Sequence, residues 1–220
     1  MESKDTKKAR ATKVLSLLKK NYKKQPNLFL NHATQAQMLC AIILSAQSTD
    51  AQINKLTKKL FVKYKTVNDF ASAVQKTFEK EIYSSGFYKN KSKNIIACFK
   101  KIKNDFKGKI PLTMGELITL PGVGRKTANL VLLNKGIIVG IAVDTHVFRL
   151  AKRFKLTKAS TQDKVEKDLM TIYPKKQWSF VNKLFIVHGR AICTARNPAC
   201  TKCFLNSKEL CPRLGVKKSD

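Results

Sequence analysis

Four cysteines lie near the C-terminal end of the sequence, in a spacing that suits a metal or cluster site. They are Cys193, Cys200, Cys203 and Cys211, in the pattern C-x6-C-x2-C-x7-C. Four thiolates so close together suit one tetrahedral metal ion or one cubane iron–sulfur cluster. Ligand type alone does not separate zinc from [4Fe–4S]. A zinc ribbon usually offers two C-x-x-C pairs, however, and this stretch has one.

A second pattern with chemical potential is a glycine turn that leads into basic residues. The stretch reads Leu120, Pro121, Gly122, Val123, Gly124, Arg125, Lys126, Thr127, Ala128. We expect the proline to fix a turn, both glycines to adopt positive φ, and a helix to begin at Lys126. Amides at a helix N-terminus bind phosphate when no Cβ crowds them. The pattern predicts a helix–hairpin–helix element, over about 112–133, with DNA-backbone contacts at Gly122, Val123, Gly124 and Arg125. The alternative is a helix corner whose glycines serve packing alone.

Lys126 and Asp144 are candidate catalytic residues. A lysine amine attacks carbon only when it is neutral, and a helix N-terminus and the adjacent Arg125 both disfavour the ammonium form. Such chemistry at a sugar also needs a carboxylate, and Asp144 is the only acidic residue between Leu117 and Thr161. Two alternatives stay open at this point. Lys126 would be one more phosphate contact, and Asp144 would be the N-cap of the following helix.

The charge of the chain predicts a polyanionic partner. The sequence has 220 residues, enough for one large domain or two small ones. Lys and Arg number 44 against 14 Asp and Glu, a formal net charge of +30. Nucleic acid is the expected partner because neutralising phosphates releases counterions. Since 37 of the basic residues are lysines, a compositional bias of the source organism accounts for part of this excess.

The sequence also indicates in which cellular compartment the protein is expected. Residues 1–24 are polar and lysine-rich, without the apolar core of a secretory signal. The longest apolar run, residues 136–143, is too short to span a bilayer. We therefore expect a soluble, intracellular monomer without membrane contact, in the cytoplasm or nucleoid if the source is bacterial. In a reducing compartment, clustered cysteines favour metal ligation over disulfides.

The elements that would position these residues are predicted to be helices. Only Ile137–Val143 is strand-like, and an isolated strand has no sheet to join, so we predict an all-α protein of ten or so helices. Cys40 and Cys98 lie in apolar helical stretches and are expected in the core. The apolar stripes at helical spacing are Ile53, Leu56, Leu60; Ile95, Phe99, Ile102, Phe106; Val147, Leu150, Ala151, Phe154; and Val165, Leu169, Ile172.

Taken together, these stretches resemble the endonuclease III family of the helix–hairpin–helix glycosylase superfamily, from roughly Val14 to Cys211. The matching segments are the hairpin, Leu120 to Asn129; the run Leu44, Ser45, Ala46, Gln47, Ser48, Thr49, Asp50; the run Val143, Asp144, Thr145, His146; and His188, Gly189, Arg190.

The resemblance implies a base excision repair activity on double-stranded DNA with damaged pyrimidines or abasic sites. A bifunctional glycosylase of this family removes an oxidised pyrimidine and then acts as an abasic-site lyase, cleaving 3′ to the site by β-elimination. Carried over to this sequence, Lys126 is the nucleophile that forms the Schiff base, and Asp144 assists its deprotonation and stabilises positive charge at the sugar.

The resemblance also implies DNA contacts outside the hairpin. Gln47 matches the residue that fills the space left by the extruded nucleotide, and Phe87 stands where relatives carry a leucine wedge. A buried aromatic is the alternative for Phe87. His146, Arg149 and Arg196 are further expected contacts, although the segment around Arg196 carries less charge than is usual in the family.

The implied fold has two lobes with DNA between them. Residues 28–138 form a six-helix barrel that contains the hairpin. Residues 1–27 and 139–220 form a second helical lobe whose loop, 193–211, carries a [4Fe–4S] cluster, and residues 137–143 become a buried connection. One departure from the family is the last cysteine interval, which is x7 here and commonly x5.

Two rival functions are considered. An adenine-mispair glycosylase lacks the hairpin lysine and carries a catalytic glutamate in the early helix, where this chain has Gln47 and no glutamate. A non-catalytic, damage-sensing DNA-binding module needs neither Lys126 nor Asp144.

Overall fold

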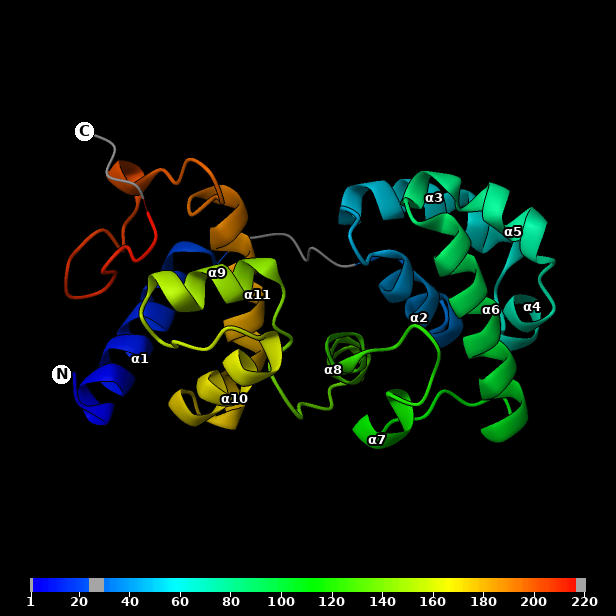
Figure 1. The fold of residues 1–220 in the computed structure, drawn as a ribbon, viewed down its shortest axis with the longest axis horizontal. Coiled ribbons are helices and arrows are strands. Elements are labelled where there is room, and N and C mark those ends of the chain that lie inside the picture. Colours follow the sequence, from blue (N-terminus) through cyan, green and yellow to red (C-terminus); the bar gives the residue numbers. More distant parts are fainter. Residues whose placement is uncertain (1, 24–29, 217–220) are drawn as a thin grey trace. The chain divides into compact units, whose positions relative to one another are not determined.

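The computed structural model describes residues 2–23 and 30–216, and within these ranges it contains helices and no strand (Figure 1). None of the described helices is long and apolar enough to cross a membrane. The helices are α1 (Lys4–Asn21), α2 (Gln35–Leu44), α3 (Asp50–Lys63), α4 (Val67–Ala71), α5 (Gln75–Glu81), η1 (Tyr83–Ser85), α6 (Tyr88–Asp105), α7 (Met114–Leu117), α8 (Arg125–Asn134), α9 (Thr145–Arg153), α10 (Gln162–Ile172), η2 (Lys175–Gln177), α11 (Trp178–Ala191) and η3 (Cys200–Lys202).

The chain divides into two compact units. One contains residues 27–137, and the other contains residues 1–26 and 138–220, so both ends of the chain belong to the same unit. The first predicted lobe boundary, between residues 27 and 28, lies outside the described residues. The second boundary between the units lies between residues 137 and 138. The hairpin therefore belongs to the middle unit, and Asp144 and the four C-terminal cysteines belong to the other unit.

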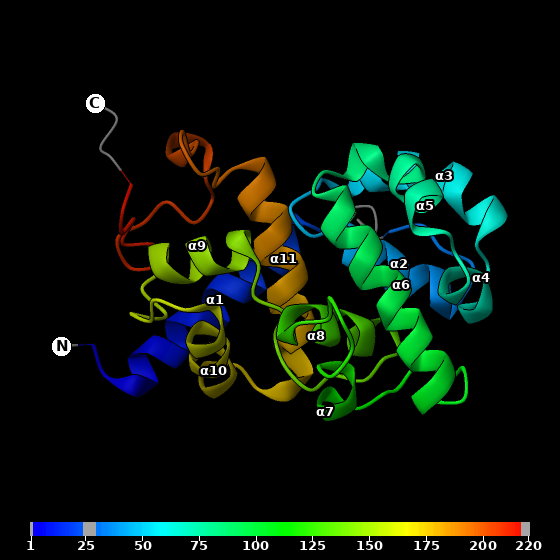
Figure 2. The same cartoon turned by 45° about the vertical axis from the view of Figure 1, so that its right-hand side comes forward.

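The middle unit is built around α2, whose residues 36–44 are all buried. This helix is apolar on every side and so belongs at the centre of the core. Helix α6 packs against α2, α4 and α5, and in Figure 2 it runs the length of the unit. Of its predicted stripe, Ile95, Phe99 and Ile102 are fully buried and Phe106 is partly buried. The ring centroid of Phe99 lies 4.5 Å from that of Phe70. Helix α8 packs against α2 and α7, which anchors the hairpin on the core.

The other unit is a helical cluster of α1, α9, α10 and α11. Helix α11 packs against both α9 and α1, and α10 packs against α9 and α1. The predicted stripe of α9 is confirmed, since Val147, Leu150, Ala151 and Phe154 are all buried. Tyr173, at the end of α10, is fully buried and donates a hydrogen bond to the Ala11 carbonyl of α1. This bond ties the N-terminal helix to the C-terminal part of the chain.

The segment Ile137–Val143 differs from both expectations for it. It has no regular secondary structure, so the strand-like pattern does not produce a strand. It is also not buried throughout, because only Ile141, Ala142 and Val143 are buried while Val139 is 37% exposed. The buried half enters the core of α1, α9, α10 and α11. The residues immediately before Asp144 thus pack in the core, whereas the preceding residues are only partly buried or, at Val139, exposed.

Candidate functional site

The hairpin is shaped by two buried side chains and one backbone hydrogen bond. Leu120 follows α7 and is buried, and the amide of Val123 donates to the Leu120 carbonyl at 3.1 Å. The Val123 side chain is 5% exposed and packs in the core of the middle unit. Val123 was expected among the DNA contacts. Its side chain is buried and its amide is bonded to Leu120, so Val123 fixes the turn, and its contact with DNA stays a prediction.

The two hairpin positions are occupied by glycine for different structural reasons. Gly122 has φ 76°, and a Cβ placed on it would lie 2.9 Å from the Cβ of Asn94 on α6. Gly124 has φ −87° and ψ 177°, and a Cβ there would meet nothing within 4 Å. The expectation of positive φ at both glycines is therefore wrong for Gly124. Any residue can adopt this backbone conformation, so backbone geometry does not require a glycine here. The lack of a side chain instead keeps the space in front of the helix N-terminus open.

The N-terminus of α8 is exposed and has no side-chain cap. Gly124 is the N-cap residue, and because it lacks a side chain the amides of the first turn receive no capping hydrogen bond from it. Gly122, Gly124, Arg125 and Lys126 are all exposed. Uncapped amides at the positive end of a helix bind anions, and two basic side chains extend from the same turn. Such a turn can accept a phosphate group, with the Lys126 amine beside it.

The different roles of the two glycines give a stability prediction. Gly122→Ala should lower the free energy of unfolding by about 2–4 kcal/mol, from left-handed strain and the contact with Asn94. Gly124→Ala is the matched control and should lose at most about 1 kcal/mol, the difference between two N-cap residues. Gly124→Ala should instead weaken DNA binding, because its methyl group occupies the approach to the amides. Urea unfolding and fluorescence anisotropy with a labelled duplex measure both effects. Equal stability of Gly122→Ala and wild type would contradict the assignment.

Gln47 and Phe87 lie in two loops of the same unit and share an unusual backbone. Both have positive φ, 57° for Gln47 and 49° for Phe87, although neither is glycine. Gln47 is exposed and Phe87 is 65% exposed, so the alternative of a buried aromatic is wrong. Exposed side chains on strained backbone are typical of functional positions. Both residues are thus displayed at the surface in fixed conformations.

Asp144 is the N-cap of α9. Its Oδ1 accepts a hydrogen bond from the amide of Val147 at 2.8 Å, so the capping role considered for this residue is observed. One carboxylate oxygen is used in this way, and the side chain is partly exposed. His146, in the first turn of α9, lies against Gly189 of α11, where an added Cβ would lie 2.9 Å from the His146 Nδ1 atom. Burial lowers the pKa of His146, whereas the nearby Asp144 carboxylate acts in the opposite direction.

Arg149 and Arg153 of α9 connect this helix to the segment that follows α11. The guanidinium of Arg149 donates to the Cys193 carbonyl and to the Gly189 carbonyl at 3.0 Å, and one of its nitrogens lies 3.0 Å from His146 Nδ1. Arg153 is 5% exposed and donates to the carbonyls of Cys193, Thr194 and Ala195. These contacts give Arg149 a structural role in addition to the DNA contact expected from the sequence. Arg196, in the loop held by Arg153, is exposed.

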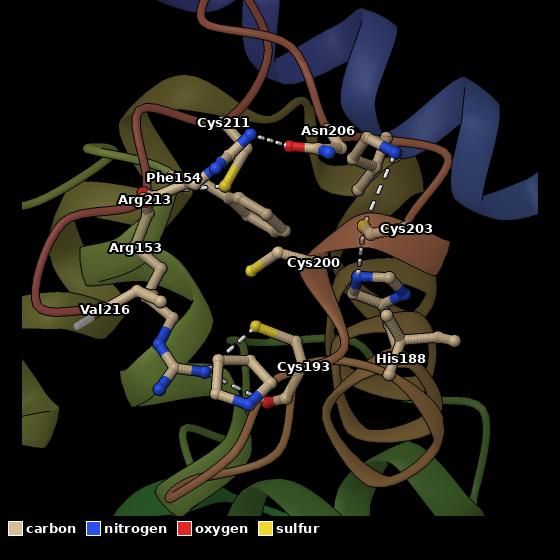
Figure 3. Close-up of a pocket in the computed structure, with 13 residues that line it drawn as sticks. Arg153, Phe154, His188, Cys193, Cys200, Cys203, Asn206, Cys211, Arg213 and Val216 are labelled. Atoms are coloured by element: carbon tan, nitrogen blue, oxygen red, sulfur yellow. Dashed lines mark hydrogen bonds between the residues drawn. The ribbon is translucent and has the colours of Figure 1, made fainter. Parts of the chain in front are cut away.

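The four C-terminal cysteines line one cavity. Figure 3 shows the sulfur atoms of Cys193, Cys200, Cys203 and Cys211 around a shared space, with Arg153 and His188 among the other lining residues. Within the described residues, no group of three or more His, Cys, Asp or Glu side chains is arranged to hold a single metal ion. Four thiols around one cavity suit a single metal or iron–sulfur site. The residues present therefore fit an iron–sulfur group.

Hydrogen bonds to the sulfur atoms support the same assignment. Arg153 donates to Cys193 Sγ at 3.1 Å, and the amide of Leu205 donates to Cys203 Sγ at 3.4 Å. The Nε2 atom of His188 lies 3.5 Å from Cys203 Sγ, and the Tyr22 hydroxyl lies 2.8 Å from Nδ1 of the same ring. Burial raises the pKa of the Cys203 thiol to about 11, so ligation of a cluster releases a proton there. Such donors stabilise the negative charge of ligating thiolates.

Sequence reasoning missed Arg153, His188 and Tyr22 as partners of the cysteines. The sequence marks His188 only as part of a segment that resembles the family, and nothing in the spacing of Arg153 or Tyr22 distinguishes them from other basic or aromatic residues. Burial lowers the pKa of His188 to about 4, so its ring is neutral and carries one N–H. The ring lies between the Tyr22 hydroxyl, which is near Nδ1, and the Cys203 sulfur, which is near Nε2.

Comparison with known proteins identifies the family. Residues 40–175 match the helix–hairpin–helix superfamily of base excision DNA repair proteins, and residues 193–207 match the iron–sulfur binding domain of endonuclease III. The second match ends before Cys211, the cysteine at the end of the long last interval. Endonuclease III of Synechocystis sp. is 46% identical over 94% of each chain, and endonuclease III of Bacillus subtilis is 42% identical over 86% of this chain and 85% of its own.

A solved structure agrees with the sequence relatives. A trapped endonuclease III–DNA covalent intermediate has a TM-score of 0.88 and 38% identity to this chain, covering 94% of this chain and 96% of the other. A non-covalent endonuclease III–DNA complex matches equally well. The cofactor of the cysteine loop is a [4Fe–4S] cluster. The chain belongs to the endonuclease III family of helix–hairpin–helix DNA glycosylases, which act in base excision repair.

Proposed function

We propose that this chain removes oxidised or otherwise damaged pyrimidines from duplex DNA and then cleaves the strand 3′ to the resulting abasic site. The observation that carries the proposal is the place of Lys126. It is exposed in the first turn of α8, immediately after an uncapped glycine hairpin. A phosphate bound by the amides of this turn brings the sugar-phosphate backbone to the lysine amine.

The proposed reaction has two stages. The damaged nucleotide is extruded from the duplex because its C1′ atom is inaccessible in the stack. The neutral amine of Lys126 attacks C1′, the glycosidic bond breaks, and the base leaves with the bonding electrons and takes up a proton. Opening of the sugar gives an imine between Lys126 and C1′. Loss of a proton from C2′ then expels the 3′ phosphate, which is the β-elimination step.

Asp144 is proposed to act on the protons and charge of this reaction. One oxygen caps α9, and the carboxylate is held in place by the Val147 amide. A carboxylate fixed in this way can take a proton from the Lys126 ammonium and stabilise positive charge that develops at the sugar. The Asp144 carboxylate thus both caps α9 and acts in the proposed reaction, and the capping hydrogen bond fixes its orientation.

DNA binding is proposed to be spread over several contacts. Gly122, Gly124 and Arg125 contact the backbone at the hairpin, while Arg196 and His146 contact it from the other unit. Gln47 and Phe87 are proposed to enter the base stack when the nucleotide leaves. The net charge of +30 supplies the remaining, sequence-independent attraction. We further propose that the protein acts as a monomer inside the cell, on chromosomal DNA.

Cys193, Cys200, Cys203 and Cys211 are the proposed ligands of the [4Fe–4S] cluster. When bound, the cluster supplies a covalent cross-link between chain segments that have little regular structure of their own. The residues of this chain do the rest: Arg153 holds the carbonyls of the loop, and His188 and the Leu205 amide orient Cys203. The cross-link holds the loop that presents Arg196.

Replacement of one ligand tests this assignment. Cys203→Ser should reduce the visible absorbance and iron content of the purified protein and lower its free energy of unfolding by at least about 2 kcal/mol, the effect of losing a cross-link. The matched control is Cys98→Ala, which removes a core thiol of the middle unit and should leave iron content unchanged. Iron determination and thermal melts measure both effects. A Cys203→Ser protein with full iron content would contradict the ligand assignment.

The function itself is tested with defined duplexes. One duplex carries a single thymine glycol opposite adenine, and a second carries adenine opposite 8-oxoguanine. We expect base release and strand cleavage on the first duplex, with a 3′ unsaturated aldehyde at the nick, and no release of adenine from the second. Release of adenine would favour the mispair glycosylase. Tight binding to both duplexes without base release would favour a damage-sensing module.

A further inference from the structure

One lysine of this lysine-rich protein is buried. Of the lysines that the structure describes, only Lys91 on α6 falls in the buried class, at 6% exposed. Burial lowers its pKa from the ordinary lysine value. Burying a lysine side chain costs rotamer freedom and also desolvates its amine. Lys91 must therefore make compensating contacts.

Those contacts join two separate loops. The Nζ atom of Lys91 donates to the Leu44 carbonyl at 2.8 Å, to Ser48 Oγ at 3.0 Å and to the Ser85 carbonyl at 2.6 Å. An ammonium has three hydrogens, and these three acceptors use all of them. Leu44 is the last residue of α2, Ser48 lies in the loop after it, and Ser85 ends η1. Lys91 thus bonds the loop after α2 to the loop before α6.

Further bonds close the same junction. The Ser48 hydroxyl donates to the Ser85 carbonyl at 2.5 Å, and the Gln52 side-chain amide donates to the Ser84 carbonyl. The two loops held together here carry Gln47 and Phe87, the exposed residues with positive φ. A non-glycine residue is strained in the left-handed region of positive φ, so both conformations persist only where the surrounding structure enforces them. Lys91 is the buried centre of those surroundings.

The same helix reaches the phosphate-binding hairpin. Asn94, one turn after Lys91, lies against Gly122, where an added Cβ would come within 2.9 Å of the Asn94 Cβ. Helix α6 is therefore in contact with the Gln47 loop, the Phe87 loop and the hairpin turn. Any displacement of the two loops relative to α6 is therefore also a displacement relative to the hairpin turn, which is proposed to bind the DNA backbone.

We propose that Lys91 is a positioning residue for nucleotide extrusion: it holds the loops of Gln47 and Phe87 at the spacing required for both side chains to enter the base stack. This inference rests on the proposed function. Lys91 does not touch the substrate in this account, and it acts through the two loops. A purely structural lysine would stabilise the middle unit without affecting the extrusion step in particular.

The experiment compares one lesion in two contexts. Single-turnover base release is measured for thymine glycol paired in a duplex and for the same lesion in an unpaired bubble, which needs no unstacking or unpairing. One variant is Lys91→Met, whose side chain is of similar length but has no hydrogen-bond donor. The other is Ser48→Ala, which removes one acceptor of Lys91 and the hydrogen bond to the Ser85 carbonyl. Lys100→Met removes one charge from an exposed position of α6 and is the matched control.

We expect Lys91→Met to release the paired lesion about 100-fold more slowly than wild type, the effect of misplacing an essential group by about 1 Å. On the bubble, its rate should stay within about threefold of wild type, and Ser48→Ala should show the same pattern with a smaller loss. If Lys91→Met does not fold, Ser48→Ala carries the comparison. Equal losses in the two contexts, or no loss in either, would overturn the proposal. An inactive wild type in both contexts would instead reject the proposed function.

Discussion

Lys126→Ala is expected to abolish strand cleavage and covalent trapping while retaining most of the affinity for duplex DNA. Alanine has no amine, so no imine can form, and no other group is assigned to that step. Binding is distributed over the hairpin amides, Arg125 and many surface charges, so loss of one cation should weaken it only a fewfold. The measurements are cleavage of an abasic-site duplex and anisotropy with the same duplex.

Lys126→Arg separates the two roles that the sequence left open for this residue. Arginine keeps the positive charge in the first turn of α8 and can contact phosphate, but it stays protonated and cannot act as the nucleophile. We expect Lys126→Arg to bind at least as well as Lys126→Ala and to be equally unable to form an adduct. Substantial cleavage by Lys126→Arg would mean that Lys126 is chiefly a phosphate contact.

Asp144→Asn is expected to lower the rate of base release by about 10²–10⁴-fold, the usual contribution of a positioned acid or base. Asparagine caps helices as well as aspartate does, so its carbonyl oxygen can replace the Oδ1 atom that accepts from Val147. The substitution therefore removes the charge and leaves the cap. Single-turnover kinetics and a melting curve measure the two properties separately.

Two controls make the Asp144 result decisive. Asp144→Ala should lose both the activity and about 1 kcal/mol of stability, because it removes the cap as well. Asp163→Asn removes a carboxylate from the first turn of α10, which is capped by Thr161, and should leave activity unchanged. Activity of Asp144→Asn close to that of wild type would show that capping is the whole role of Asp144.

The helices and their buried faces could be predicted from the sequence because they depend on local spacing. Ile53 and Leu60 of α3, and Val165 and Leu169 of α10, are buried as their periodicity predicts. The third member of each stripe, Leu56 or Ile172, is partly buried. The N-cap of α3 is Thr49, whose side chain accepts from the amide of Gln52. The core positions of Cys40 and Cys98 are confirmed as well.

Properties that depend on contacts between distant residues could not be predicted in this way. Lys91 is one of 37 lysines, and its burial follows from carbonyls contributed by two other segments. A local pattern predicts the same role for Gly122 and Gly124, because it does not show that α6 packs against Gly122 while Gly124 faces open space. Positive φ at Phe87 is similarly invisible, since residue type argues against it.

The cysteine loop shows the same division between local and distant information. The four cysteines were evident from spacing, because ligands of one cluster lie close together in the sequence. Their partners were not evident, since Arg153 comes from α9, His188 from α11 and Tyr22 from the end of α1. Between Cys193 and Cys211 the only helix is the short η3, so hydrophobic periodicity carries no information about how the loop folds.

The most direct test of the central claim is borohydride trapping on a duplex with one abasic site, followed by peptide mapping of the adduct. Reduction converts the imine to a stable amine and so marks the nitrogen that attacked C1′. We predict one covalent adduct, located on the peptide that contains Lys126 and absent from Lys126→Ala. An adduct on a different lysine or on the N-terminal amine, or no adduct despite tight binding, would contradict the assignment of Lys126 as the nucleophile.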